Sequence, residues 1–318
     1  MKAVILAGGL GTRLRPLTYS IPKSLVPLAG KPLIRRIIDG LPSSVDTVVL
    51  AVSYMKEALE DYFLLEPCGR KVILVNESSP MGTGGAIKNV AQHIDGTFIV
   101  QNGDCVSSLD IKAMVRAHRE SGGLGTLALW EVEDPSAFGV VDLERDMRII
   151  DFQEKPSLAE AKSNLINAGV YVFEPEILDY IGKGQVSLER EVFPRVIEYG
   201  LYGHRFQGFW VDCGTLKNTL VAQRAMLDRE NPQAPADFDC AIIPPNLIRA
   251  KELKGCHVGP NVCLEPEVRI GAGTHVENAL VMKGACLGTN CKISGSIIGP
   301  GIKVNDGESV VDSIVAAR

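Results

Sequence analysis

The sequence predicts an α/β protein with a doubly wound mixed sheet, mostly parallel, followed by a smaller parallel β-helix. Short apolar runs alternate with helix-like segments up to about residue 230, which is the pattern of such a sheet. Beyond residue 246 aliphatic residues recur at every sixth position instead. We therefore expect a first domain over 1–230, a proline-rich linker over 231–246 and a β-helix over 247–318.

The first domain shows strand and helix signals in alternation. An apolar run at 4–6 stops at glycine and is predicted to be a buried strand. The further strands are expected over 45–52, 72–75, 97–101, 125–132, 140–143 and 164–173. Helices are expected over 32–39, 56–65, 86–93 and 216–228, with another beginning after Ser187 as a candidate N-cap.

The composition excludes several classes of protein. The net charge is −5 and the isoelectric point is about 5.7, which argues against a nucleic-acid partner. No apolar run is long enough for a membrane-spanning helix, and the first residues lack the pattern of a signal peptide. The eight cysteines contain no Cys-x-x-Cys pair, so we expect reduced thiols and a cytoplasmic protein without a membrane partner.

A basic, glycine-rich stretch follows the first strand. Gly8, Gly9 and Gly11 allow backbone N–H groups to approach an anion closely. Arg13, Arg15 and Lys23 add positive charge, and residues 1–38 contain no acidic residue. The stretch matches neither the Walker A motif nor the Gly-x-Gly-x-x-Gly fingerprint. It predicts a site that gathers a small polyanion.

The string Gly-Gly-Leu-Gly-Thr-Arg-Leu-x-Pro-x-Thr-x-x-x-Pro-Lys over 8–23 resembles the signature of sugar-1-phosphate nucleotidyltransferases. Over the whole chain the sequence is most similar to the mannose-1-phosphate guanylyltransferases of that family. The resemblance implies a Rossmann-like catalytic domain and a left-handed form of the hexapeptide-repeat β-helix. It also implies Mg²⁺ as cofactor, with a nucleoside triphosphate and a sugar 1-phosphate as small-molecule partners.

The resemblance carries family roles onto matching positions. Arg13 and Lys23 would be catalytic through their contacts with phosphates, and Asp104 and Asp212, each at a predicted strand end, would bind the metal ion. The nucleotide would contact Gly8, Gly9, Gly11, Thr12, Glu77, Gly82, Thr83 and Gly84. The sugar phosphate would contact Gly139, Glu154, Lys155 and Asn167.

Glu77 bears on the choice of base. It stands where thymidylyl- and uridylyltransferases of the family typically carry Gln. A carboxylate only accepts hydrogen bonds, so it suits the N1–H and 2-amino group of guanine together. Uracil and thymine offer one donor and two acceptors, which suits an amide better. GTP is therefore the expected nucleotide, unless Glu77 is instead solvated.

The expected reaction is in-line attack of mannose 1-phosphate on the α-phosphorus of GTP, giving GDP-mannose and pyrophosphate. Four alternatives stay open: transfer of thymidylyl or uridylyl groups to glucose 1-phosphate, a heptose-phosphate guanylyltransferase, a bifunctional enzyme whose β-helix is an acyltransferase, and a non-catalytic nucleotide-sugar sensor. The sensor would be expected to have lost Lys23, Asp104 or Asp212, and all three are present.

The six-residue period defines the end of the chain. The aliphatic residues at its positions are Val258, Leu264, Ile270, Val276, Val281, Leu287, Ile293, Ile298, Val304 and Val310. Two steps are five residues long instead of six. Each aliphatic residue is expected to point into the interior of a β-helix, and the open end of such a coil predicts a homo-oligomer.

Overall fold

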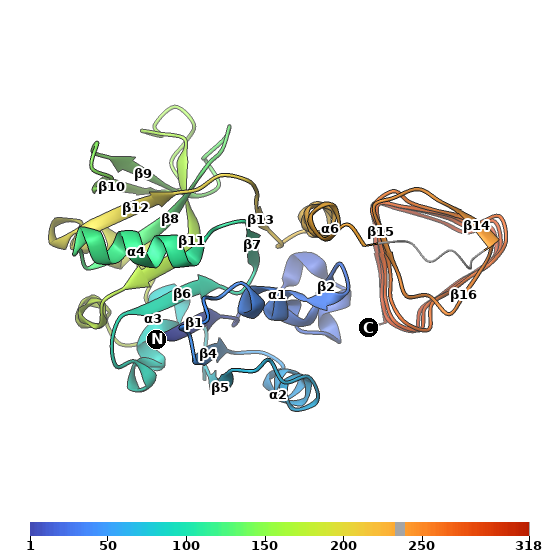
Figure 1. The fold of residues 1–318 in the computed structure, drawn as a ribbon, viewed down its shortest axis with the longest axis horizontal. Helices are drawn as coiled ribbons and strands as arrows, with labels where there is room; N and C mark the ends of the chain where they lie inside the picture. Colours follow the sequence, from blue (N-terminus) through green and yellow to red (C-terminus); the bar gives the residue numbers. More distant parts are fainter. Residues whose placement is uncertain (233–238, 318) are drawn as a thin grey trace. The chain divides into compact units, whose positions relative to one another are not determined.

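The computed structural model describes residues 1–232 and 239–317. The chain forms two compact units that are not contiguous in sequence (Figure 1). The first unit contains Met1–Gly9 and Arg35–Trp210. The second contains Leu10–Ile34 and the described residues from Val211 onward. The glycine-rich stretch is therefore divided after Gly9, and most of it belongs with the C-terminal part of the chain.

The first unit contains a nine-stranded mixed sheet. Its path runs in the order β10–β9–β11–β6–β1–β4–β5, with β8 beside β11 and β12 beside β8. The strands are β1 (Lys2–Leu6), β4 (Thr47–Val52), β5 (Lys71–Asn76), β6 (Phe98–Asn102), β8 (Gly125–Glu131), β9 (Gly139–Leu143), β10 (Ile149–Glu154), β11 (Leu165–Phe173) and β12 (Leu201–Arg205). Parallel pairing joins β6, β1, β4 and β5, whereas β11 pairs antiparallel with three neighbours. The doubly wound mixed sheet predicted from the sequence is confirmed.

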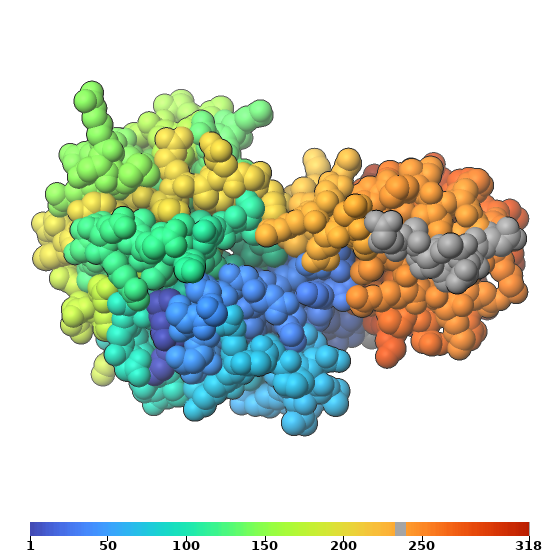
Figure 2. Space-filling view, in the orientation of Figure 1, coloured from blue at the N-terminus to red at the C-terminus, as the bar shows by residue number. Residues whose placement is uncertain are grey.

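Strand β1 is central because it is apolar on both faces. Ala3, Val4 and Ile5 are completely buried, as expected for a strand covered on both sides. In the space-filling view, only a small part of the dark blue N-terminal segment reaches the face drawn (Figure 2). The chain proceeds from β1 through β4 to β5 and then returns to the other side of β1 as β6. A crevice for a ligand is expected at this reversal, beyond the carboxyl ends of β1 and β6.

The helices agree with the predicted ranges at most positions. They are α1 (Leu33–Asp39), α2 (Lys56–Leu65), α3 (Gly82–Asn89), α4 (Ile111–Ser121), α5 (Phe193–Val196) and α6 (Leu216–Glu230). Helix α3 begins four residues before the predicted start at 86. Ser187 caps the helical segment Leu188–Val192 by accepting the N–H of Arg190, as expected. The sequence patterns above did not predict α4, which begins at an Asp110 cap whose side chain accepts the N–H of Ala113 at 3.0 Å.

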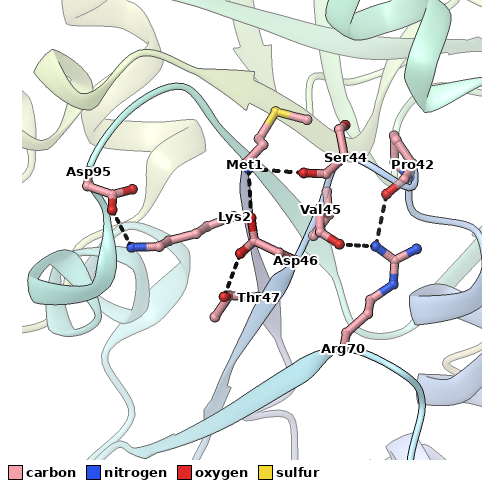
Figure 3. Close-up of polar contacts among 9 residues, drawn as sticks. All are labelled: Met1, Lys2, Pro42, Ser44, Val45, Asp46, Thr47, Arg70 and Asp95. Carbon is pink, nitrogen blue, oxygen red and sulfur yellow. Dashed lines mark hydrogen bonds and ion pairs between the residues drawn. The ribbon is translucent and has the colours of Figure 1, made fainter.

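Polar contacts hold the start of β1, at the end of the strand away from Gly8 (Figure 3). The terminal amino group of Met1 donates to the Ser44 carbonyl at 3.0 Å and pairs with the Asp46 carboxylate at 3.2 Å. Lys2 pairs with Asp95 at 2.7 Å. The guanidinium of Arg70 donates to backbone carbonyls of the segment that enters β4, including Pro42 at 2.9 Å. These contacts fix the starts of four neighbouring strands, β6, β1, β4 and β5, against one another.

The second unit ends in a domain of parallel strands, which Figure 1 shows as stacked triangular coils. The strands are β14 (Asp239–Ile242), β15 (Asn246–Ile248), β16 (Glu252–Val258), β17 (Val262–Leu264), β18 (Arg269–Ile270), β19 (His275–Glu277), β20 (Ala279–Val281), β21 (Cys286–Leu287), β22 (Lys292–Ser294), β23 (Ile297–Ile298), β24 (Lys303–Val304), β25 (Ser309–Val311) and β26 (Ile314–Val315). We call residues 239–317 the parallel β domain. Residues 233–238 of the predicted linker lie outside the described residues, but β14 already pairs with β16. The domain thus begins earlier than residue 247, the start that the sequence predicted.

The aliphatic residues of the six-residue period form three interior columns of this domain. Leu253, Ile270, Leu287 and Val304 are register partners in one column, each 17 residues after the last. A coil of 17 residues is two steps of six and one of five, which explains the two short steps in the sequence. All ten predicted positions are at most 5% exposed and belong to one apolar cluster. The predicted inward orientation of these residues is confirmed.

The outer face of the same domain packs against the segment 10–34 and α6. We call the shared apolar contact the docking cluster, and its buried members are Leu17, Val26, Leu220, Cys263, Leu280, Met282 and Ile297. Gln223 of α6 is 1% exposed and donates Nε2 to the carbonyls of Asn261 and Ala279, at 3.2 and 3.0 Å. Arg249 donates to the Gly30 carbonyl at 3.3 Å. The parallel β domain therefore supports both the basic stretch and the helix that follows Asp212.

Within the described residues, no helix is long and apolar enough to cross a membrane. Two further short strand pairs complete the described elements. Strands β2 (Pro27–Leu28) and β3 (Lys31–Pro32) form a hairpin inside the segment 10–34. Strand β7 (Cys105–Ser107) follows Asp104, and strand β13 (Trp210–Asp212) ends at Asp212 and precedes α6.

Candidate active site

Three of the predicted site residues of the first unit follow directly after the carboxyl ends of β1 and β6. Leu6 and Asn102 end the paired strands as register partners. Gly8 and Gly9 follow β1, and Asp104 follows β6 after one glycine. The N–H of Gly103 donates to the Leu6 carbonyl at 2.9 Å, which ties the two turns together. The predicted nucleotide loop and the first predicted metal ligand, Asp104, thus both follow the same end of the paired strands β1 and β6.

Glu77 lies beside Gly8 at this edge. Its N–H donates to the Val52 carbonyl at 2.7 Å, and its carboxylate accepts the Met81 N–H at 3.4 Å. The residue is 8% exposed, and burial raises the pKa of its carboxyl group, while the Met81 N–H acts in the opposite direction. Ser53 donates its hydroxyl to the Gly8 carbonyl and closes the other side. The reading of Glu77 as a solvated surface residue is therefore wrong.

The glycines at the start of α3 serve packing. The N–H groups of Gly84 and Gly85 both donate to the Val186 carbonyl, at 2.9 and 3.2 Å. Gly82 has φ +69°, and a Cβ built on it would lie 2.5 Å from the same carbonyl oxygen. The sequence predicted that N–H groups of this segment could bind a carbonyl or phosphate, and in the structure two of them bind a carbonyl of the protein itself. Thr83 is the exception in this segment, because its side chain is directed to a carboxylate described below.

The predicted sugar-phosphate residues come from the hairpin of β9 and β10. Gly139 and Glu154 are register partners there. Lys155 follows with φ +54°, its N–H donates to the Phe138 carbonyl at 2.9 Å, and its ammonium group lies 3.7 Å from the Glu154 carboxylate. Burial and the nearby Glu189 carboxylate raise the pKa of Glu154 against the effect of Lys155. Glu154 is thus held in a partly desolvated, acidic environment.

Asn167 of β11 belongs to the same region. Its Nδ2 donates to the hydroxyl of Tyr171 at 2.9 Å, and its Oδ1 accepts the Gly169 N–H at 3.1 Å. Burial raises the pKa of the Tyr171 hydroxyl, and the Glu189 and Glu154 carboxylates act in the same direction. Asn167 therefore contacts a buried hydroxyl group whose ionisation the Glu154 and Glu189 carboxylates oppose.

Glu189 is the site residue that the sequence motifs missed. Its Oε2 accepts the hydroxyls of Thr83 at 2.7 Å and Ser187 at 2.8 Å. Thr83 also accepts the N–H of Leu188 at 2.9 Å. Glu189 therefore joins a predicted nucleotide residue to the region of Glu154. The string Ser187-Leu188-Glu189 indicated only a helix start, because nothing in its spacing points to residues 30 or more positions away.

The second unit carries the remaining predicted residues. Arg13 Nη2 lies 3.9 Å from Asp212 Oδ2, a long ion pair with the arginine mostly exposed. Asn218 donates to the Asp212 carbonyl at 2.9 Å and fixes the start of α6. Gly11 has φ +60°, and its carbonyl accepts the Thr18 hydroxyl at 2.8 Å. Lys23 is 9% exposed, and Thr12 is exposed at the start of a short 3₁₀ helix.

Comparison with known proteins agrees with this arrangement. The nucleotidyl transferase family model matches residues 2–229, and the model of the GMPPB C-terminal domain matches 242–318. Mannose-1-phosphate guanylyltransferase 1 of Arabidopsis thaliana is 36% identical over 315 residues, which cover 94% of this chain and 86% of that protein. The mannose-1-phosphate guanylyltransferase catalytic subunit beta of Xenopus tropicalis is 35% identical, with the same shares covered.

Solved structures with a similar fold match the larger part of the chain. HddC from Yersinia pseudotuberculosis, complexed with GMP-PN, has a TM-score of 0.61 and 29% identity over 71% of this chain and 99% of that one. A UDP-glucose pyrophosphorylase complexed with UDP-glucose has a TM-score of 0.64 and 25% identity over 72% of this chain and 98% of that one. Both family models match in chain order, and the first covers most of the residues, so the chain belongs to the nucleotidyl transferase family.

Proposed function

We propose that the protein transfers a guanylyl group from GTP to mannose 1-phosphate and releases pyrophosphate. The observation that carries the choice of base is the buried carboxylate of Glu77 beside Gly8. A buried carboxylate accepts the two neighbouring donors of guanine and offers no donor to uracil or thymine. The names of the relatives in Arabidopsis thaliana and Xenopus tropicalis support the same reaction.

Positioning and charge supply the chemistry of such a transfer. Arg13 and Lys23 would neutralise the triphosphate and the leaving pyrophosphate. Lys155 would hold the phosphate of the sugar. Glu154 would accept hydrogen bonds from the sugar hydroxyl groups, and Asn167 would donate to them. No residue is needed as a general base, because the attacking phosphate oxygen is already ionised near neutral pH.

The donor set of Asp104 and Asp212 fits Mg²⁺. Both offer carboxylate oxygens, the hard ligands that Mg²⁺ prefers, and the ion completes its coordination with phosphates and water. Mg²⁺ bound there would supply positive charge to the phosphate oxygens. Phe209, three residues before Asp212, exchanges hydrogen bonds with Ser108, four residues after Asp104. Each aspartate is therefore within four residues of this Ser108–Phe209 contact along the chain.

The test is Mg²⁺-dependent pyrophosphate release with GTP, UTP, dTTP and ATP, each crossed with mannose, glucose, N-acetylglucosamine and heptose 1-phosphates. We expect GTP with mannose 1-phosphate to be the best pair by kcat/KM. We also expect Glu77→Gln to lower the preference for GTP over dTTP at least about tenfold, since one carboxylate oxygen becomes a donor. A wild-type preference for dTTP or UTP would overturn the guanine proposal but keep the reaction class. No release with any pair would overturn both.

A second experiment tests the phosphate and metal residues. Asp104→Asn and Lys23→Ala should each lower kcat by orders of magnitude while circular dichroism stays unchanged. Asp134→Asn is a matched control, because Asp134 is an exposed aspartate of the first unit with local contacts to the backbone and side chain of Ser136. Near-normal turnover in Asp104→Asn would contradict the metal assignment.

We further infer that the parallel β domain is a left-handed β-helix and that its open end associates with a second copy. The regular 17-residue coils and their terminal strand edges support this inference. Light scattering after size-exclusion chromatography measures the mass of the assembly directly. A monomer at all concentrations would contradict the association.

A further inference from the structure

A pocket of about 610 Å³ lies in the first unit at the ends of β8, β11 and β12. Leu129 and Leu165 contribute apolar surface, Trp130 and Phe206 contribute aromatic rings, and Glu131 and Arg205 contribute opposite charges. The volume is within the range of small-molecule sites in proteins. None of these residues belongs to the predicted nucleotide, sugar-phosphate or metal set.

The aromatic pair offers a surface for a ring. The centroids of Trp130 and Phe206 are 5.1 Å apart at an interplanar angle of 40°, and both side chains are partly exposed. The faces of aromatic rings carry negative potential, so they attract weakly positive C–H groups. One face of a pyranose ring presents several such C–H groups together, which makes it a fitting partner.

The ion pair of Glu131 and Arg205 favours a neutral ligand over a charged one. Glu131 Oε2 lies 3.1 Å from Arg205 Nη2, and Glu131 Oε1 accepts the Asn164 Nδ2 at 2.9 Å. The two charged side chains are 57% and 54% exposed, so they remain accessible to a ligand. A phosphate would be attracted by Arg205 and repelled by Glu131, whereas hydroxyl groups donate to the carboxylate and accept from the guanidinium.

We propose that this pocket binds a neutral pyranose ring, either as a free hexose or as the sugar end of a nucleotide sugar. The proposal does not rest on the proposed function, because it uses none of the residues assigned there. Gln207 and Gly208 also line the pocket, and Ser108 accepts the Phe209 N–H and donates to the Gln207 carbonyl at 2.9 and 2.8 Å. A bound ring would therefore contact the segment that leads to Trp210 and Asp212.

Saturation-transfer NMR with methyl α-mannopyranoside, methyl α-glucopyranoside and GDP-mannose tests the proposal in the full chain. We expect saturable transfer to the ring C–H protons, retained in Glu154→Gln because that residue is outside the pocket. Trp130→Ala should weaken binding about tenfold and Trp130→Phe much less, since an aromatic face remains. Binding to the free hexosides would identify a site for any hexose. Binding to GDP-mannose alone, if Trp130→Ala weakens it, would identify a site for the nucleotide sugar.

Three outcomes would overturn the proposal. They are no transfer to any of the three probes, transfer that Trp130→Ala leaves unchanged, and competition by inorganic phosphate at millimolar concentration. If Trp130→Ala fails to fold, Glu131→Gln replaces it, since its side chain is exposed and the change conserves shape. Glu131→Gln should weaken binding severalfold, with Glu133→Gln as the control that leaves it unchanged. Pyrophosphate release without added hexose should be the same in Trp130→Ala as in the wild type, which separates this test from that of the proposed function.

Discussion

Gly8 and Glu77 fit together only because residue 8 has no side chain. A Cβ atom built on Gly8 would lie 2.9 Å from Glu77 Oε1 and 3.2 Å from Ser53 Oγ. Glu77 is held from its other side by β4, through the Val52 carbonyl, so it has little room to retreat. The glycine that begins the basic stretch thus also sets the position of the proposed base-reading carboxylate.

The substitution Gly8→Ala should therefore move Glu77 and weaken GTP binding. We expect the KM for GTP to rise about tenfold or more, with a smaller change in the KM for the sugar phosphate. Steady-state kinetics against each substrate measures the two effects separately. Gly96→Ala is the control, since a Cβ built on Gly96 meets no atom within 4 Å and should change neither constant. Equal changes in both substrates would indicate general misfolding instead.

The raised pKa of Glu77 predicts how GTP binding depends on pH. Burial favours the protonated form in the free protein, and guanine requires the ionised form as acceptor. Binding should therefore be strongest above the pKa of the free protein and should weaken as pH falls through it. Fluorescence titration with a GTP analogue from pH 8 to pH 5 measures this. In Glu77→Gln the same acidic loss should be much smaller, and an equal loss would contradict the assignment.

Glu189 should control the ionisation of Glu154. Its negative charge raises the pKa of Glu154, so Glu189→Gln should lower that pKa. The acidic limb of the pH–rate profile for kcat/KM of the sugar phosphate should then move to lower pH. Glu191→Gln is the matched control, because Glu191 is on the same helical segment but accepts only the Ser187 N–H. A shift in the control of equal size would contradict the role of Glu189.

His118 should make stability fall at acidic pH. It is 1% exposed, its Nδ1 is 2.9 Å from the Thr126 hydroxyl, and its Nε2 is 3.2 Å from Glu174. Burial lowers its pKa below the ordinary value of 6.5, and Glu174 opposes this only in part. The folded state therefore prefers the neutral ring, and its stability is lost as pH falls from about 6.5 through the folded pKa. Urea unfolding at pH 7.5 and pH 5.5 should show a smaller difference in His118→Gln than in the wild type.

The docking cluster should matter for activity as well as stability. Leu280→Ala should cost about 2–5 kcal/mol and should also lower kcat, because Leu280 supports the segment that carries Arg13 and Lys23. Val281→Ala is the matched control, since Val281 is equally buried but points into the interior column. It should lower the melting temperature while leaving kcat unchanged in the folded enzyme. A parallel loss of kcat in both variants would show that the docking cluster has no particular role.

Local patterns in the sequence determined the alternation of the sheet, the buried strand β1 and the ten interior positions of the parallel β domain. Each of these depends on residues a few positions apart, so spacing alone carries the information. The role of Ser187 as a cap was predictable for the same reason. The resemblance carried by the basic stretch pointed to the family that the comparisons then showed.

Only the tertiary structure decided which distant residues meet. Glu189 reaches Thr83 across 106 positions, and Val186 occupies the space that Gly82 and Gly84 leave open. The segment 10–34 belongs with residues from Val211 onward because its apolar side chains pack on the outer face of coils that the chain forms much later. Such contacts depend on how elements pack, and packing leaves no period or motif at either residue.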